Sequence, residues 1–166
     1  MTRVMPPTEL ATYFIAERQG GFFLVALALV SLGFAAVLWA NRSAFVAMAW
    51  PLVVLGSLQL VIGLVVALRT PAQVASLEQG LRASSATTVT AEMQRMKRVN
   101  TNFRVVKVVE ASVIVVGLLL VLGLPHPGTW PSVGLGLLVE AAVLLAFDAF
   151  AHQRALVYTR WLQGLR

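Results

Sequence analysis

The stretch "GFFLVALALVSLGFAAVLWA", residues 21–40, contains no charged side chain. A helix needs about 20 predominantly apolar residues to cross the hydrocarbon core of a bilayer, and this stretch has that length. Three further runs share its character, at residues 44–68, 105–124 and 132–150. A soluble core would not need four such runs. The sequence therefore predicts an all-α membrane protein, a four-helix transmembrane bundle that forms a single domain over residues 1–166.

The composition supports a membrane protein. The chain is 58% hydrophobic and 12% charged, whereas soluble domains average roughly 45–50% and 25%. Cysteine is absent, which excludes disulfides, thiolate metal sites and thiol nucleophiles.

The basic residues predict the orientation. They gather before residue 21, between the second and third apolar runs and after residue 150, and Arg42 alone falls on the other side. By the positive-inside rule both termini and segment 69–104 are cytoplasmic, so we expect a multi-pass protein of the bacterial inner (plasma) membrane. Trp39, Trp50 and Trp130 then form an outer aromatic belt. The short outer loops "NRSA" and "PHPGTWP" each close an antiparallel hairpin.

Segment 69–104 is predicted to be broken. Pro71 opens a short helix, "SSATTVT" (residues 84–90) reads as a loop, and Thr90 is a candidate N-cap. From Thr90 the third helix extends inward, with an apolar stripe whose first members, Met96, Val99 and Phe103, pack against other helices at their cytoplasmic ends.

The tail, residues 151–166, is predicted to be an amphipathic helix at the lipid headgroups. Its apolar residues towards the lipid are Leu156, Val157, Trp161, Leu162 and Leu165.

Glu140 stands in the middle of the fourth apolar run, where an ionised carboxylate costs roughly 2.5–3.5 kcal/mol on insertion scales. No basic residue occurs at its depth. It forms the predicted intramembrane polar site with Gln59 and Ser31. One interpretation is a proton or cation site, or a contact for a partner's transmembrane segment. The other is a neutral carboxyl group that holds helices together by a hydrogen bond to Gln59 or Ser31.

Two polar pairs are predicted at the cytoplasmic interface from their spacing along one helix. Lys107 precedes Glu110 by three residues, and His152 follows Asp148 by four. The neighbouring basic stretch is expected to contact anionic lipid headgroups rather than nucleic acid, through Arg95, Lys97, Arg98 and Arg104.

No catalytic motif with a nucleophile, a phosphate loop or a metal-ligand spacing occurs in the chain. His126 lies outside and His152 inside, so they cannot share a metal or a haem across roughly 30 Å of hydrocarbon. The sequence therefore predicts a protein that is not an enzyme and that has no cofactor and no metal.

The fourth run and the tail, "GLGLLVEAAVLLAFDAFAHQRALVYTRWL", resemble the end of a group of small uncharacterised bacterial four-helix inner-membrane proteins. The residues that carry the resemblance are Gly134, Gly136, Glu140, Asp148, Phe150, Ala151, Arg154, Tyr158 and Leu162. Some of these proteins resemble immunity proteins against contact-delivered toxins, including type VI secretion effectors. The resemblance implies a binding partner.

The first functional hypothesis is a non-enzymatic inner-membrane binding protein, an immunity protein that neutralises a membrane-inserting toxin. The second is a small proton- or cation-coupled transporter or channel that uses Glu140, as a homo-oligomer. The third is an accessory subunit of a larger membrane complex. A neighbouring gene for a large secreted protein would favour the first, and proton-coupled flux in liposomes would favour the second.

Overall fold

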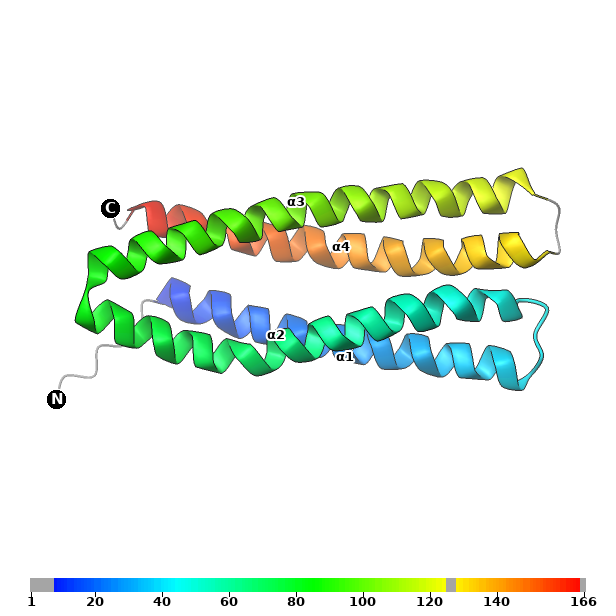
Figure 1. The fold of residues 1–166 in the computed structure, drawn as a ribbon, viewed down its shortest axis with the longest axis horizontal. Coiled ribbons are helices and arrows are strands. Elements are labelled where there is room, and N and C mark those ends of the chain that lie inside the picture. Colours follow the sequence, from blue (N-terminus) through cyan, green and yellow to red (C-terminus); the bar gives the residue numbers. More distant parts are fainter. Residues whose placement is uncertain (1–7, 125–127, 165–166) are drawn as a thin grey trace.

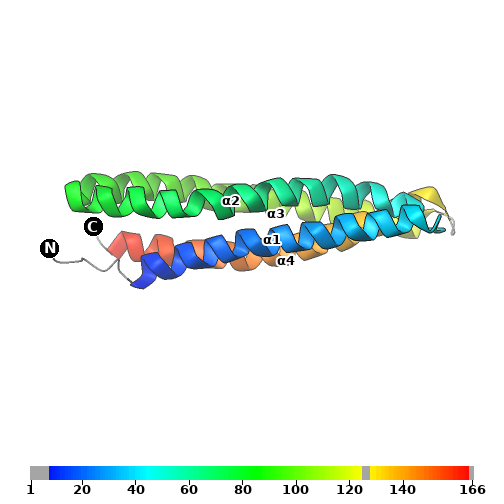
Figure 2. The same ribbon diagram turned by 90° about the horizontal axis from the view of Figure 1, so that it is seen from below.

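The computed structural model describes residues 8–124 and 128–164, which form a long bundle of helices. The elements are α1 (Thr8–Ala40), a short 3-10 turn η1 (Val46–Met48), α2 (Ala49–Ala83), α3 (Ser85–Gly123) and α4 (Thr129–Gly164). The most extensive contacts join α1 to α2 and α3 to α4. The two pairs lie side by side (Figure 1), and a quarter turn shows them aligned along the whole bundle (Figure 2).

The two ends of the bundle are called the Ser84 end and the Arg42 end. The Ser84 end holds the start of α1, the junction of α2 with α3 and the end of α4. The Arg42 end holds the loop between α1 and η1. The predicted all-α class is confirmed for the described residues. Each of the four long helices is apolar and long enough to cross a membrane.

The helices are longer than predicted. Segment 69–104 is helical apart from Ser84, which is extended at φ −156° and ψ 96° and separates α2 from α3. The predicted loop at residues 84–90 and the N-cap at Thr90 are therefore wrong, and Pro71 lies inside α2 instead of opening a helix. The tail continues α4 without a break.

Glycines set the distance between helices within each pair. A Cβ added at Gly63 of α2 would lie 2.7 Å from the carbonyl oxygen of Gly21 in α1. A Cβ at Gly117 of α3 would lie 2.9 Å from the carbonyl oxygen of Gly134 in α4. Both distances are shorter than a normal van der Waals contact, so a larger residue at either position would push the two backbones apart. Small residues are typical of helix interfaces that pack this closely in membranes.

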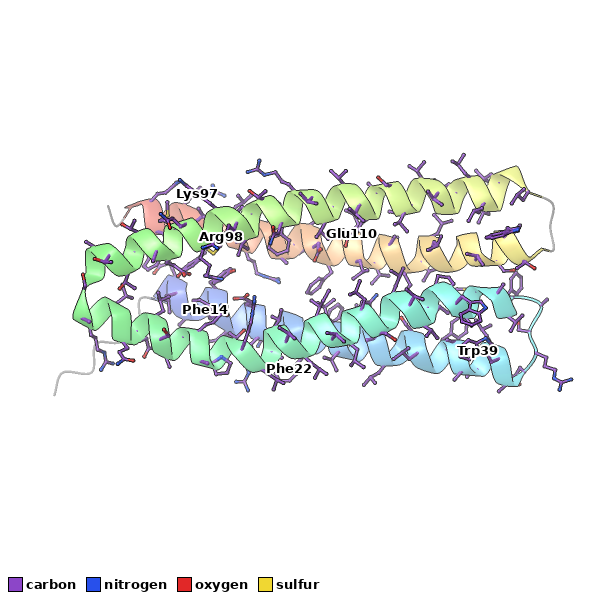
Figure 3. The ribbon with its side chains drawn as sticks, viewed as in Figure 1. Phe14, Phe22, Trp39, Lys97, Arg98 and Glu110 are labelled. Atoms are coloured by element: carbon purple, nitrogen blue, oxygen red, sulfur yellow. The ribbon has the colours of Figure 1, made fainter. Side chains whose placement is uncertain are left out.

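The largest buried cluster lies at the Ser84 end and joins all four helices. Its fully buried members include Leu10 of α1, Met96 of α3 and Tyr158 of α4. The predicted packing of Met96, Val99 and Phe103 against other helices is confirmed, since the latter two pack against this cluster. Figure 3 shows Phe14, a further member, between the two helix pairs.

The tail residues divide between the cluster and the surface. Leu162 is buried in the cluster and Trp161 packs against it, so their predicted placement at the lipid headgroups is wrong. Leu156 and Val157 are exposed, as expected for a lipid-facing side. Leu165 lies outside the described residues.

At the Arg42 end, α1 ends in a Schellman motif. The backbone N–H of Ser43 donates to Leu38 O at 3.2 Å, and that of Arg42 donates to Trp39 O at 3.2 Å. Arg42 occupies the left-handed position with φ 46°, where helices usually place glycine. Trp39, labelled in Figure 3, meets Trp50 edge to face with ring centroids 5.8 Å apart.

We expect Arg42→Gly to stabilise the fold. A Cβ in the left-handed region costs roughly 1–2 kcal/mol, and the greater freedom of glycine in the unfolded chain offsets part of the gain, so the net effect is about 0.5–1 kcal/mol. The measurement is the thermal unfolding midpoint in detergent. Arg42→Ala removes the same charge but keeps the Cβ, so it should give no gain. An equal gain from both variants would assign the effect to charge.

Candidate functional site

The structure brings Glu140 of α4 and Gln59 of α2 together inside the bundle. Both are buried, with 4% and 3% of their surface exposed. The Gln59 amide donates a hydrogen bond to the Glu140 carboxyl group. Ser31 of α1 lies instead beside Gly56, where an added Cβ would be 3.2 Å from the Ser31 Cβ. Within the described chain Ser31 makes no hydrogen bond to Glu140.

The Glu140–Gln59 contact joins the two helix pairs, because α2 and α4 belong to different pairs. No ion pair involves Glu140 among residues 8–124 and 128–164. Its Oε1 atom and that of Gln59 are buried without a hydrogen-bond partner there. A buried polar group without its partner costs about 1–3 kcal/mol. The Gln59–Glu140 hydrogen bond therefore offsets part of the free energy lost when these two side chains are buried.

The four residues predicted as pairs along single helices contact one another between helices instead. The Lys107 Nζ atom lies 2.8 Å from His152 Nδ1, and one turn along the antiparallel helices Glu110 of α3 faces Asp148 of α4. The ion pairs of the described chain include neither Lys107 with Glu110 nor Asp148 with His152. Spacing within a helix identified the four residues but not their partners, since the partners depend on how α3 and α4 face each other. Figure 3 labels Glu110 on α3 beside α4.

The basic residues predicted to face lipid headgroups do not all point outward. Lys97, Arg98 and Arg104 are exposed, and Figure 3 marks the first two near the Ser84 end of α3. Arg95 points inward. Its guanidinium donates to both carboxylate oxygens of Glu92, at 2.8 and 2.7 Å. It also lies 5.6 Å from the Phe14 ring centroid, so this arginine is paired at the edge of the buried cluster, unlike the three exposed basic residues.

Glu92 also accepts a hydrogen bond of 3.2 Å from the Tyr158 hydroxyl, which ties α3 to α4 beyond the apolar segments. Burial, followed by the Glu92 carboxylate, raises the pKa of Tyr158 above its ordinary value. The hydroxyl therefore stays protonated as a donor. The Tyr158 ring stacks on Tyr13 with centroids 4.4 Å apart. This network was not predicted from the sequence, although a glutamate three residues before an arginine on one helix indicates an ion pair.

A cavity of about 330 Å³ lies between the two helix pairs, towards the Ser84 end. All four helices line it. Its apolar walls come mainly from the apolar segments, and its polar groups, apart from Asp148 near the end of the fourth apolar segment, come from the helix extensions nearer Ser84. The apolar lining includes Leu24, Ile62, Val66, Val106 and Phe147, and the polar lining is Tyr13, Glu17, Arg69, Asn102, Asp148 and Arg154.

The charged groups at the cavity balance one another. Arg69 of α2 donates to Glu17 of α1 at 3.4 Å. Arg154 of α4 lies over Gly20, where an added Cβ would be 3.7 Å from its guanidinium. With Asp148, the wall carries two basic and two acidic side chains. The cavity was not predicted from the sequence, because its lining residues come from helices that are far apart in the chain.

The comparisons with known proteins give no match to any family model, curated protein or solved structure. No group of three or more His, Cys, Asp or Glu side chains that could hold a metal occurs in the described residues. His126 lies outside them.

We expect Glu140→Gln to keep the fold and Glu140→Ala to destabilise it. Glutamine can still accept the Gln59 hydrogen bond, whereas alanine leaves a void and an unpaired amide, at about 1–3 kcal/mol. Thermal unfolding in detergent measures the difference. The matched control is Val139→Ala, which shortens an exposed neighbour on α4 and should have little effect. Equal losses for Gln and Ala would mean that the carboxyl group itself is required.

Proposed function

We propose that the protein is a multi-pass membrane protein that binds an amphiphilic, lipid-like molecule in the cavity between its helix pairs and performs no catalysis itself. The observation that carries this proposal is the cavity, which all four helices line and which is apolar towards one end and charged towards the other. Its volume of about 330 Å³ is at the lower end of the range of small-molecule sites, roughly 300–1,000 Å³.

The two parts of the cavity match the two parts of an amphiphile. Leu24, Ile62 and Phe147 belong to apolar segments and offer contacts to a hydrocarbon chain. Arg154 and Asp148 lie nearer the Ser84 end and carry opposite charges. A headgroup with a phosphate and an ammonium, such as that of a zwitterionic phospholipid, would find a partner for each charge there.

We infer that the cavity opens between α2 and α3, because a residue of each helix that lines it is exposed. These helices meet at Ser84 and diverge from it (Figure 1). Ile62 of α2 and Val106 of α3 line the cavity and are 44% and 40% exposed. In a bilayer this opening faces lipid, so an amphiphile would enter sideways from its own leaflet without passing through water.

The proposal includes the orientation predicted from the sequence, with the Ser84 end in the cytoplasm of a bacterial inner membrane. The distribution of the basic residues supports this orientation. Among the described arginines and lysines, Arg42 alone lies in the loop between α1 and η1, and the others lie farther towards the Ser84 end. Neutralisation of a toxin, proton- or cation-coupled transport through Glu140 and membership of a larger complex stay predictions. The genes beside this one and flux measurements in liposomes would test them.

We expect Val106→Trp to block binding. The indole would occupy the cavity from its rim, whereas Val109→Trp adds the same group to a 55% exposed position of α3 that does not line the cavity. The probe is a lysophosphatidylcholine with a spin-labelled chain, titrated onto protein in nanodiscs. Unsubstituted protein and Val109→Trp should bind saturably and equally, with affinity at least about tenfold lower for Val106→Trp, a loss of 1.4 kcal/mol. Equal binding by all three would contradict the proposal.

The orientation can be tested with single cysteines, because the chain has none of its own. Ser43→Cys lies in the loop at the Arg42 end, and Ser84→Cys lies at the junction of α2 with α3. A membrane-impermeant maleimide added to spheroplasts should label the first cysteine and not the second. Labelling of Ser84→Cys should appear after the membrane is permeabilised. The reverse pattern would invert the orientation.

A further inference from the structure

Two acidic side chains meet in the interface of α3 with α4. Lys107 of α3 lies against His152 of α4, and one turn farther along these antiparallel helices Glu110 of α3 faces Asp148 of α4. Glu110 is 7% exposed and Asp148 is partly buried, so the two carboxyl groups interact there. Two carboxylates side by side in an apolar surrounding repel each other, and a hydrogen bond between carboxyl groups requires a proton on one of them.

A single cation accompanies the two acids. The Lys107 ammonium has only donors and lies 2.8 Å from His152 Nδ1, so this ring nitrogen accepts the hydrogen bond and the imidazole is neutral. The Phe103 ring stacks on it at a centroid distance of 5.3 Å. With two ionised carboxylates, the four residues would carry a net negative charge, and one bound proton makes the cluster neutral.

We propose that Glu110, Asp148, Lys107 and His152 form a buried proton-binding site, in which the two carboxyl groups share one proton. Neutrality is what an apolar interior demands of a buried cluster. The proton resides between α3 and α4, and its removal would leave a charge that the cluster cannot balance.

The cluster suits a proton better than a metal ion. The Nδ1 lone pair of His152 is occupied by Lys107, so two carboxyl groups are the remaining ligands. Lys107 also repels cations electrostatically. A sodium ion would neutralise the same charge, so sodium serves as the competitor in the test of this site.

Two polar atoms of the cluster remain without a partner inside the described part of the bundle. Glu110 Oε2 and His152 Nε2 are buried and have no hydrogen-bond partner in the described chain, and both side chains are more than nine-tenths buried. The first is an acceptor. The second is a donor, because the hydrogen of the neutral ring lies on Nε2 when Nδ1 accepts.

Asp148 also lines the cavity between the helix pairs, so the shared proton lies beside that cavity. The other charged groups near the cluster are Arg104, which acts electrostatically on His152, and those of the cavity wall. On the wall, Glu17 and Arg69 pair with each other, and Arg154 stands on the same helix as Asp148. The site does not depend on amphiphile binding, so either proposal can fail alone.

The test is infrared spectroscopy of the full-length protein in nanodiscs, at neutral pH and at low and high NaCl. Glu140→Gln serves as the background, because it removes the other buried acid of the apolar segments. We expect a protonated-carboxyl band in Glu140→Gln that is lost when Glu110→Gln or Asp148→Asn is added. In these variants the amide donates to the remaining carboxylate without an extra proton. High NaCl should leave the band unchanged.

The proposal would be overturned if Glu140→Gln shows no protonated-carboxyl band. It would also be overturned if that band persists both when Glu110→Gln is added and when Asp148→Asn is added. A band abolished by NaCl would also overturn it, in favour of a sodium site. If the double variants do not fold, the unsubstituted protein still gives a test, because Asp148 is its one aspartate. With carbon-13 aspartate, solid-state NMR should place the Asp148 carboxyl signal between those of ionised and protonated carboxyl groups. A fully ionised signal would contradict sharing.

Discussion

Long polar side chains in and beside the apolar core of this bundle pair with polar side chains of other helices, and these contacts help to set how the helices lie against one another. Glu17 with Arg69 joins α1 to α2. Lys107 with His152 joins α3 to α4. Glu140 with Gln59 joins the two helix pairs. Apolar contacts tolerate sliding of one helix along another, whereas each polar contact requires one register.

The sequence predicted the helical class because long apolar runs have few alternatives in a protein. It also named Gln59 as a partner for Glu140, since few other polar residues occur within the apolar runs. It did not predict the length of the helices. Pro71 is a poor residue inside a helix, but α2 continues through it, because Val74, Leu77 and Leu81 pack against the cluster at the Ser84 end. Tertiary packing outweighs the local preference for a break.

The candidate site was predictable in its residues and not in its contacts. Glu110, Lys107, Asp148 and His152 stood out as polar groups near the ends of apolar runs. Their pairing depends on the rotation of α3 against α4, which spacing along a single helix does not contain. Arg95 shows the same limit: its charge favoured the surface, yet Glu92 and the Phe14 ring hold it inside. The cavity is a property of four helices at once and leaves no local pattern.

The link at Ser84 has a mechanical consequence. A single extended residue joins two helices of 35 and 39 residues, and glycine contacts hold the backbones close within each helix pair. The backbone therefore crosses from one helix pair to the other at Ser84 alone, and side-chain contacts must fix how the pairs lie against each other. Glu140 with Gln59 is one such contact. The close packing of Gly136 against Met48 and Pro51 is another, at the Arg42 end of the bundle.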